Sequence, residues 1–502
     1  MRYGEVQNSS APHQQQAHGT LKMSLNVIAE RAFTDADQEW FASVTGDRNP
    51  MHMDALAARR TMAGFPVVHG IHTLLWTLDN LFRHLPDLGP PASIRASFEK
   101  MIYIGDRVRA VLLHHDPKRL RMEVLVEDVT AIGLDVEFGD PRPADATIAD
   151  GPVHQPTEPS NLTFDQMVAC HGLVPLPDAL ASLSQMFPAV AGVLGSQRVA
   201  GLACSSFLVG MVCPGLHSIY RNLNLALTPL GEDDHDRLHF RVKYSDSDYR
   251  LVRLAVSGAG WTGLIDTNAR PEPTAQADLA SIATKLTQGE FEGTSALVVG
   301  GSRGLGELVA KILSAGGAHV TLTYAAGEAD ARRLQAQIND FGGRCDIMRY
   351  DVREDAGDQL SRLATTPTAL YYMATPMIFQ RARGGFSAQR LQAFLAFYVT
   401  GFSDLCRALR SHAGSDLAIF YPSSVSIDER PANMTEYTMA KAAGEVLCAD
   451  MQSFEKWGPI LVRRLPRLPT DQTATLFEDD EADDPVEAML AIVRELHASR
   501  AG

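Results

Sequence analysis

The chain has 502 residues, of which 45% are hydrophobic and 21% are charged, a composition typical of globular proteins with about three domains. A formal net charge of -15 argues against nucleic acid or an anionic membrane as the main partner, because both require a basic surface. With no membrane-length apolar run, no secretory signal and no CxxC pair among its six cysteines, the chain is expected to be a cytoplasmic protein with reduced thiols.

The first folded region is expected over residues 24–140, after a polar stretch at 1–23 that is expected to be disordered. It begins with a helix that Thr34 can cap, followed by a polar turn and a strongly apolar helix over 70–82. It ends in alternating, strand-like runs at 108–113 and 120–126.

The polar turn and the start of the apolar helix carry a recognisable pair of motifs. The turn reads GDRNPMHMD from Gly46, and a Val-His-Gly triplet ends at Gly70. Together they resemble the signature of the MaoC-like, (R)-specific enoyl-thioester hydratases, which have the hotdog fold. The resemblance implies that Asp47 and His52 are catalytic. It also implies that the Gly70 N–H is the oxyanion donor and that Asn49 supports the loop.

The chemistry of hydration explains these residue types. Water adds across a C=C bond conjugated to a thioester, so one group must take a proton from water and another must give one to the α-carbon. A carboxylate and an imidazole that hold one water molecule can do both. Pro50 is expected to keep a helix from continuing through the motif, so that Asp47 and His52 meet by loop curvature.

A second region is expected over residues 161–270, after a linker rich in Pro, Asp and Gly at 141–160. It has an apolar helical stretch over 176–194, then the segment CPGLHSIY. Strand-like runs follow at 238–244 and 251–256. Because the order of elements echoes the first region, we interpret it as a diverged internal copy.

This second copy lacks the catalytic turn. Its corresponding segment is taken to be CPGLHSIY, which has His217 but no Asp-x-Asn-Pro-x-His. We expect it to be the catalytically silent half of a double hotdog, which completes the sheet and an acyl tunnel. No metal site is expected at His217 or at the pair His69 and His72, since no second cluster of ligands stands at a suitable spacing.

The third region is expected over residues 291–502, after a linker at 271–290. Strand-like runs alternate with helical ones, which indicates a parallel sheet with helices on both faces. The expected fold is therefore an α+β double hotdog followed by an α/β, Rossmann-type, doubly wound parallel sheet.

A glycine-rich turn, GGSRGLG from Gly300, follows the first strand of this region and opens a helix. Glycine permits a sharp turn close to a pyrophosphate, and the helix N-terminus binds the anion. The second strand ends at Tyr324 without a carboxylate for a ribose 2′-hydroxyl, and Arg303 has no acid opposing it, which favours NADP(H). Asp351 is placed to accept from the adenine amino group. The expected nucleotide-binding residues are Gly300, Ser302, Arg303, Gly304, Leu305, Gly306, Tyr324, Asp351, Val352, Ala374, Tyr437 and Lys441.

A YxxxK motif, Tyr437 to Lys441, lies downstream of this turn, and Ser424 precedes it. With the glycine turn, these residues resemble the short-chain dehydrogenase/reductase family, and within it the 3-oxoacyl-thioester reductases. The resemblance implies that Tyr437 is the acid, Lys441 its tuner and ribose ligand, and Ser424 the donor to the carbonyl. A phenol has a pKa near 10, and a nearby ammonium is expected to lower it.

This region also departs from the reductase pattern at four positions. Val299 stands where the family has Thr, and residues 373–376 read Met-Ala-Thr-Pro in place of an Asn-Ala-Gly-like turn. Tyr398 falls where the family has its active-site Asn, and Arg467 follows Pro466 where the family has Gly. One alternative is therefore a domain that binds the nucleotide without turning it over.

The preferred hypothesis is a bifunctional enzyme of fatty-acid or polyketide-type biosynthesis. It would reduce a 3-oxoacyl thioester with NADPH and dehydrate the 3-hydroxyacyl product to the trans-2-enoyl thioester, or run the reverse hydration. The substrate would be carried by coenzyme A or an acyl carrier protein, and a homodimer is expected. The alternatives are a hydratase/dehydratase with a non-catalytic Rossmann domain, and a non-catalytic scaffold that docks acyl carriers.

Overall fold

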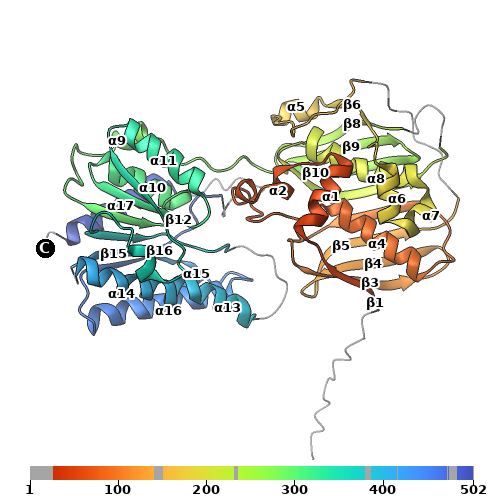
Figure 1. The fold of residues 1–502 in the computed structure, drawn as a ribbon. Coiled ribbons are helices and arrows are strands. Elements are labelled where there is room, and N and C mark those ends of the chain that lie inside the picture. The colour runs from red at the N-terminus through yellow and green to blue at the C-terminus, as the bar shows by residue number, and fades with distance from the viewer. Residues whose placement is uncertain are drawn as a thin grey trace, which may run out of the picture.

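The computed structural model describes residues 26–140, 148, 151–230, 236–378, 386–414, 416–471, 473 and 483–500. The stretch at 1–23, expected to be disordered, lies outside them. Figure 1 shows that the described chain forms two bodies, the first coloured red to yellow-green and the second green to blue. Among these residues, every helix is too short or too polar to span a bilayer.

The first body is built on one sheet that contains both predicted copies. Over the described residues it has ten strands in the order β1-β3-β4-β5-β2-β7-β10-β9-β8-β6. Each half repeats the other about the antiparallel junction of β2 and β7, where Ser93 pairs with Ala226. The strands are β1 (Val27–Ala32), β2 (Ser93–Phe98), β3 (Arg107–His115), β4 (Arg119–Val126), β5 (Val129–Glu137), β6 (His171–Pro175), β7 (Ser218–Leu227), β8 (Arg237–Asp246), β9 (Leu251–Gly258) and β10 (Trp261–Ala269).

Helices of both halves lie between the strands of this body (Figure 1). Thr34 caps α1 in a capping box with Asp37, as predicted. The central helix α4 places Leu74 and Leu78 fully inside a core that both halves share, and burial of each such leucine contributes about 1.5–3 kcal/mol. The helices are α1 (Asp35–Thr45), α2 (Pro50–Met53), α3 (Ala55–Ala58), α4 (Gly70–His84), α5 (Phe164–Val168), α6 (Leu180–Met186), α7 (Pro188–Leu194), α8 (Ser196–Phe207) and the π-helical η1 (Leu208–Val212).

Two expectations about the second half were wrong. The helical stretch expected over 176–194 is two short helices, α6 and α7, and the central helix of this half is α8, continued by η1. The segment CPGLHSIY follows η1 and leads into β7. It therefore corresponds to the loop between α4 and β2, and not to the catalytic turn, which precedes α4.

The second body is a parallel sheet with helices on both faces, as predicted. Its described strands have the order β13-β12-β11-β14-β15-β16 and pair in parallel. Alternate residues of β11 enter separate cores, Val298 on the face of α10 and Leu297 on the face of α14. From β11 the chain adds β12 and β13 on one side, and it then crosses over to add β14, β15 and β16 on the other side. Such folds bind ligands at this switch point, between β11 and β14. The strands are β11 (Ser295–Val299), β12 (His319–Tyr324), β13 (Arg344–Arg349), β14 (Ala369–Tyr372), β15 (Ala418–Ser424) and β16 (Ile460–Leu465).

The helices of this body are α9 (Leu279–Ala283), α10 (Gly304–Ala315), α11 (Glu328–Asp340), α12 (Ala356–Leu360), α13 (Ala388–Leu395), the π-helical η2 (Ala396–Gly401), α14 (Phe402–Ala413), α15 (Ser426–Glu429), α16 (Thr435–Ser453) and α17 (Pro485–Ser499). The two bodies meet where the segment after α3 touches the loops of the parallel sheet. There, the Arg303 guanidinium donates to the Arg59 carbonyl, and Arg60 pairs with Asp330.

Candidate active sites

The loop that carries Asp47 begins where α1 ends. Gly46 closes that helix with a φ of 77°, a left-handed conformation that glycine adopts without strain. Asn49 then caps α2 by accepting from the Met51 N–H. Pro50 is the first residue of α2, where its fixed φ suits a helix start. No helix runs through the motif, since α1 ends before Gly46, and Pro50 in addition opens the short helix that carries His52.

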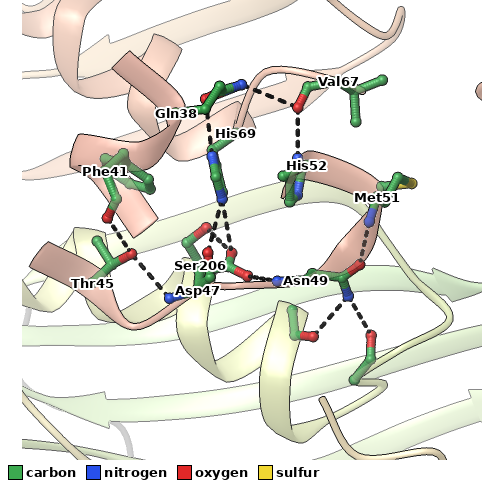
Figure 2. Close-up of polar contacts among 12 residues, drawn as sticks. Gln38, Phe41, Thr45, Asp47, Asn49, Met51, His52, Val67, His69 and Ser206 are labelled. Atoms are coloured by element: carbon green, nitrogen blue, oxygen red, sulfur yellow. Dashed lines mark hydrogen bonds and ion pairs between the residues drawn. The ribbon is translucent and has the colours of Figure 1, made fainter. Parts of the chain in front are cut away.

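Asp47, His52 and His69 converge as Figure 2 shows. Their candidate donor and acceptor atoms all lie within 4.8 Å of one another. The His52 and His69 rings are stacked, with centroids 3.9 Å apart. The His52 Nδ1 lies 2.7 Å from the Val67 carbonyl. A carbonyl cannot donate, so Nδ1 carries the proton and Nε2 keeps a lone pair for chemistry.

The Asp47 carboxyl is almost fully buried. Burial raises its pKa, while the charge of His52 and hydrogen bonds from Ser206 and the Asn49 N–H lower it. The Ser206 hydroxyl donates to Asp47 Oδ2 at 2.6 Å. Asp47 is thus a buried carboxyl with polar neighbours, and its pKa is moved toward the range useful for proton transfer.

The second half also supplies polar partners to this site. Asn49 Nδ2 donates to the Gly210 and Gly215 carbonyls at 2.8 and 3.1 Å. A Cβ on Gly210 would lie only 2.4 Å from Asp47 Oδ1, so glycine is what lets the carboxylate approach. The half expected to be silent therefore contributes Ser206 and two backbone carbonyls. Sequence reasoning missed these residues, because no local motif marks them.

His69 also belongs to this cluster, although the sequence analysis gave it no role. Its Nδ1 faces Gln38 Oε1 at 3.0 Å, and its Nε2 faces the Asp47 carbonyl at 3.1 Å. Burial lowers the pKa of His69 well below its usual value. Both of these oxygens are acceptors, so the neutral ring donates to only one of them at a time. Because both ring nitrogens face protein oxygens, we interpret His69 as a ring that supports the acid–base pair Asp47 and His52.

His72, the other histidine weighed as a metal ligand, is a core residue. It stacks on Phe41 with centroids 4.8 Å apart. Neither of its ring nitrogens has a hydrogen-bond partner among the described residues. Burial lowers its pKa to about 3. His217 contacts Asn161 at 2.9 Å, and among the described residues it joins no group of potential metal ligands.

Gly70 is the first residue of α4, as predicted. Its N–H is one of the opening groups that have no partner within the helix. The ring of Phe98 would lie 2.8 Å from a Cβ on Gly70, so a side chain there would displace this ring. Its role as an oxyanion donor stays a prediction.

In the second body, the glycine turn forms a cradle that side chains would fill. Gly300 has a φ of 77°, and a Cβ on it would lie 2.9 Å from the Ala374 backbone. A Cβ on Gly306 would lie 2.2 Å from the Gly300 carbonyl. The turn borders a cavity of about 510 Å³, which every residue predicted to bind the nucleotide lines. The cradle and the cavity fit a dinucleotide with its pyrophosphate at the start of α10.

Ser424, Tyr437 and Lys441 all line the same cavity. The expected effect of Lys441 on Tyr437 is not what the structure shows: burial raises the pKa of Tyr437, and a hydrogen bond with Ser424 lowers it. Lys441 Nζ donates to the Pro422 carbonyl at 2.7 Å and lies 3.8 Å from the centroid of the Tyr398 ring. It lies 5.8 Å from the centroid of the Tyr437 ring. The ammonium therefore faces other groups, and burial lowers its pKa to about 7.

Tyr398 links two of the departures from the reductase pattern. It lies in the π-helical η2, and its ring packs edge-on against Tyr437 with centroids 5.7 Å apart. Its hydroxyl shares a 2.5 Å hydrogen bond with Thr375, in the altered turn at 373–376. Its carbonyl accepts from the Tyr421 hydroxyl at 2.9 Å. The tyrosine and the altered turn are thus one linked arrangement beside Lys441.

Arg303 corrects another expectation. The sequence showed no acid opposing it, but Asp471 Oδ2 lies 3.7 Å from its guanidinium. The same guanidinium donates to the Arg59 carbonyl. Asp351, expected near adenine, accepts two hydrogen bonds from the Arg353 side chain. Both residues line the cavity, and each already has a partner of opposite charge.

Comparison with known proteins gives matches for both bodies. Residues 16–133 match the family described as MaoC like domain, and residues 294–462 match short chain dehydrogenase. Over 91 residues, the chain is 35% identical to a 3-hydroxybutyryl-CoA dehydratase of Methylorubrum extorquens, covering 18% of this chain and 57% of the relative. Over 104 residues, it is 28% identical to a peroxisomal hydratase-dehydrogenase-epimerase of Saccharomyces cerevisiae, covering 21% and 10%. The chain thus spans less than two thirds of either relative.

Solved structures are also similar to the second body. A 3-oxoacyl (acyl-carrier-protein) reductase from Agrobacterium tumefaciens with NADP bound is 20% identical, with a TM-score of 0.37, over 41% of this chain and 88% of that one. A short chain dehydrogenase from Burkholderia cenocepacia in complex with NADP is 22% identical, with a TM-score of 0.36, over 42% and 94%.

Proposed function

The chain joins an N-terminal MaoC-like dehydratase domain to a C-terminal short-chain dehydrogenase domain, and from this we propose that it reduces a 3-oxoacyl thioester and dehydrates the product. The observation that carries the proposal is the pair of acid–base centres, Asp47 with His52 and Tyr437 with Ser424. Both suit chemistry at the β-carbon of a thioester. The product of the reduction is the substrate of the dehydration.

At the dehydratase centre, His52 and Asp47 divide the proton transfers. His52 Nε2 accepts the proton from the α-carbon, since Nδ1 is committed to the Val67 carbonyl. Asp47, whose pKa is raised by burial, protonates the hydroxyl that leaves the β-carbon as water. The Gly70 N–H, at the start of α4, stabilises the enolate oxygen. Hydration follows the same steps in reverse.

At the reductase centre, NADPH would supply a hydride for the β-carbonyl carbon. The glycine turn would hold its pyrophosphate, and Lys441 would bind its ribose. Ser424 hydrogen-bonds the carbonyl oxygen, and Tyr437 donates the proton that completes the hydroxyl. Burial of Tyr437 keeps its hydroxyl protonated and ready to donate. The preference for NADPH is supported by β12, which ends at Tyr324 without a carboxylate.

The thioester carrier is coenzyme A or an acyl carrier protein. The name of the Methylorubrum extorquens relative makes four-carbon coenzyme A thioesters the first substrates to assay. The test is to mix the purified chain with 3-oxobutyryl-CoA and NADPH, then with longer 3-oxoacyl thioesters, and follow NADPH absorbance. Oxidation that depends on the thioester is expected. Hydration of the trans-2-enoyl thioester is measured separately.

A second candidate is favoured by Tyr398, which occupies the place of the usual asparagine and faces Lys441. In this case the dehydrogenase domain binds the nucleotide without using it, and the chain is a hydratase/dehydratase only. Nucleotide binding without NADPH oxidation, across several chain lengths, would establish this candidate. Binding of an acyl carrier with neither activity would instead support a scaffold.

A further inference from the structure

Arg59 belongs to the dehydratase domain but lines the nucleotide cavity of the dehydrogenase domain. It directly follows α3, and its carbonyl accepts a hydrogen bond from Arg303. Through this contact the hotdog body closes one side of the cavity. The sequence gave no sign of it, because Arg59 precedes the glycine turn by more than two hundred residues.

The Arg59 guanidinium lies over the loop that follows β12. Its Nη1 is 3.1 Å from the position of a Cβ on Gly327, the residue that caps α11. As a glycine, Gly327 offers no capping side chain to the opening N–H groups of α11. Tyr324, the last residue of β12, and Ala325, the first residue of this loop, both line the cavity. In dinucleotide folds, the end of this second strand receives the adenosine ribose.

The neighbouring cations lie against acidic side chains, whereas Arg59 is influenced by the charge of Asp471 but forms no ion pair among the described residues. Arg60 pairs with Asp330, Arg353 with Asp351, and Arg303 lies near Asp471. Arg59 Nη1 is buried and has no hydrogen-bond partner in the part of the chain that the structure describes. A buried guanidinium nitrogen without an acceptor is costly, which indicates that a ligand supplies the acceptor.

The local charge favours an anion here. Burial lowers the pKa of Arg59, and the charge of Arg60 lowers it further, while the charge of Asp471 raises it in part. Burial and the charge of Arg59 also lower the pKa of Arg303, to about 10. A phosphate between Arg59 and Arg303 would supply both acceptors and opposite charge, as phosphates do with planar guanidinium groups.

We infer that Arg59 of the dehydratase domain binds the 2′-phosphate of the nucleotide held by the dehydrogenase domain. This inference rests on the proposed function, since it requires a nicotinamide nucleotide in the cavity. It makes the dehydratase domain part of the selection of NADPH over NADH. Arg303, attached to the Arg59 carbonyl, fixes where the Arg59 backbone lies.

The test compares Arg59→Gln with Arg60→Gln, the adjacent arginine that pairs with Asp330 and does not line the cavity. Dissociation constants for NADPH, NADH, 2′,5′-ADP and 5′-AMP are measured by titration of the full chain. Arg59→Gln is expected to weaken the binding of NADPH and 2′,5′-ADP by roughly ten- to hundredfold. Its dissociation constants for NADH and 5′-AMP should stay within about twofold of those of the unaltered chain. In Arg60→Gln, the dissociation constants of all four ligands should stay within about twofold. Arg59→Lys keeps the charge but loses the planar guanidinium that can donate two parallel hydrogen bonds. Its affinity for NADPH should therefore lie between those of the unaltered chain and Arg59→Gln.

The outcomes separate the inference from the proposed function. Equal weakening of NADPH and NADH in Arg59→Gln, or unchanged NADPH binding, overturns the role of Arg59 and leaves the proposed function standing. If the unaltered chain binds neither nucleotide, the proposed function fails and the inference fails with it. Thermal melting of each variant shows whether its fold is intact, and Arg59→Lys tests the inference should Arg59→Gln not fold.

Discussion

The two candidate centres are built in different ways. At the dehydrogenase centre, Ser424, Tyr437 and Lys441 come from neighbouring elements, β15 and α16. At the dehydratase centre, Asp47 and His52 lie close in sequence, but the Ser206 that binds Asp47 stands 159 residues away in the other half. The catalytic side chains of the first centre thus come from one domain, whereas the second centre is completed only across two halves.

This difference indicates which residues each centre depends on, and therefore which substitutions should impair it. The dehydrogenase centre depends on the residues of its own sequence motif, together with Tyr398, which lies outside that motif. The dehydratase centre depends on a second half whose own copy of the motif is gone. A half without acid–base residues of its own can thus still hold the carboxylate of the other half.

Asp47→Asn should give the largest effect, and on one centre only. The amide cannot exchange the proton, so hydration of a trans-2-enoyl thioester should fall by roughly 10²–10⁴-fold. Thioester-dependent NADPH oxidation should stay near the level of the unaltered chain. Unchanged hydration in this variant would remove Asp47 from the mechanism.

Tyr437→Phe is the matching change at the other centre. Without the phenol there is no proton for the carbonyl oxygen, and NADPH oxidation should fall by about a hundredfold or more. The dissociation constant of NADPH should move by no more than about threefold, and hydration should persist. A reductase that keeps its full rate would show that another group supplies the proton.

Gly210→Ala tests the contact between the halves. The added Cβ would stand 2.4 Å from Asp47 Oδ1, and the carboxylate must move away. A displacement of this size should lower hydration by roughly ten- to a hundredfold. Gly192→Ala is the control, since nothing lies within 4 Å of its added Cβ. Equal rates in the two variants would show that Gly210 is not needed for space.

Ser206→Ala should give the smallest effect, about tenfold in the hydration rate, because one hydrogen bond to a charged group is lost. In hydration, Asp47 must be ionised. The Ser206 hydrogen bond lowers the pKa of Asp47, so its loss raises that pKa and moves the acid limb of the pH profile upward. Ser205→Ala, which loses a bond to Tyr220 instead, should leave the limb in place. An acid limb that does not move in Ser206→Ala would contradict the account.

Much of this organisation could be predicted from the sequence, because the motifs are local. The glycine turn, the YxxxK helix and the Asp47 loop each lie within a few residues. The central helix α8 could not be placed, since every residue from Val199 to Phe207 is buried and no solvent-facing side marks the helix. The sequence did not identify Ser206, Gly210 and Arg59 as functional residues, because their partners are distant in sequence and packing alone brings them together.

The central claim is that both centres act in turn on one β-carbon, and product analysis tests it most directly. The unaltered chain, Asp47→Asn and Tyr437→Phe are each incubated with 3-oxobutyryl-CoA and NADPH, and the thioesters are identified by mass. The account predicts enoyl and 3-hydroxyacyl thioesters from the unaltered chain. It predicts only the 3-hydroxyacyl thioester from Asp47→Asn, and neither product from Tyr437→Phe. Enoyl thioester from Asp47→Asn at the unaltered rate, or no reduced product from any chain, would contradict it.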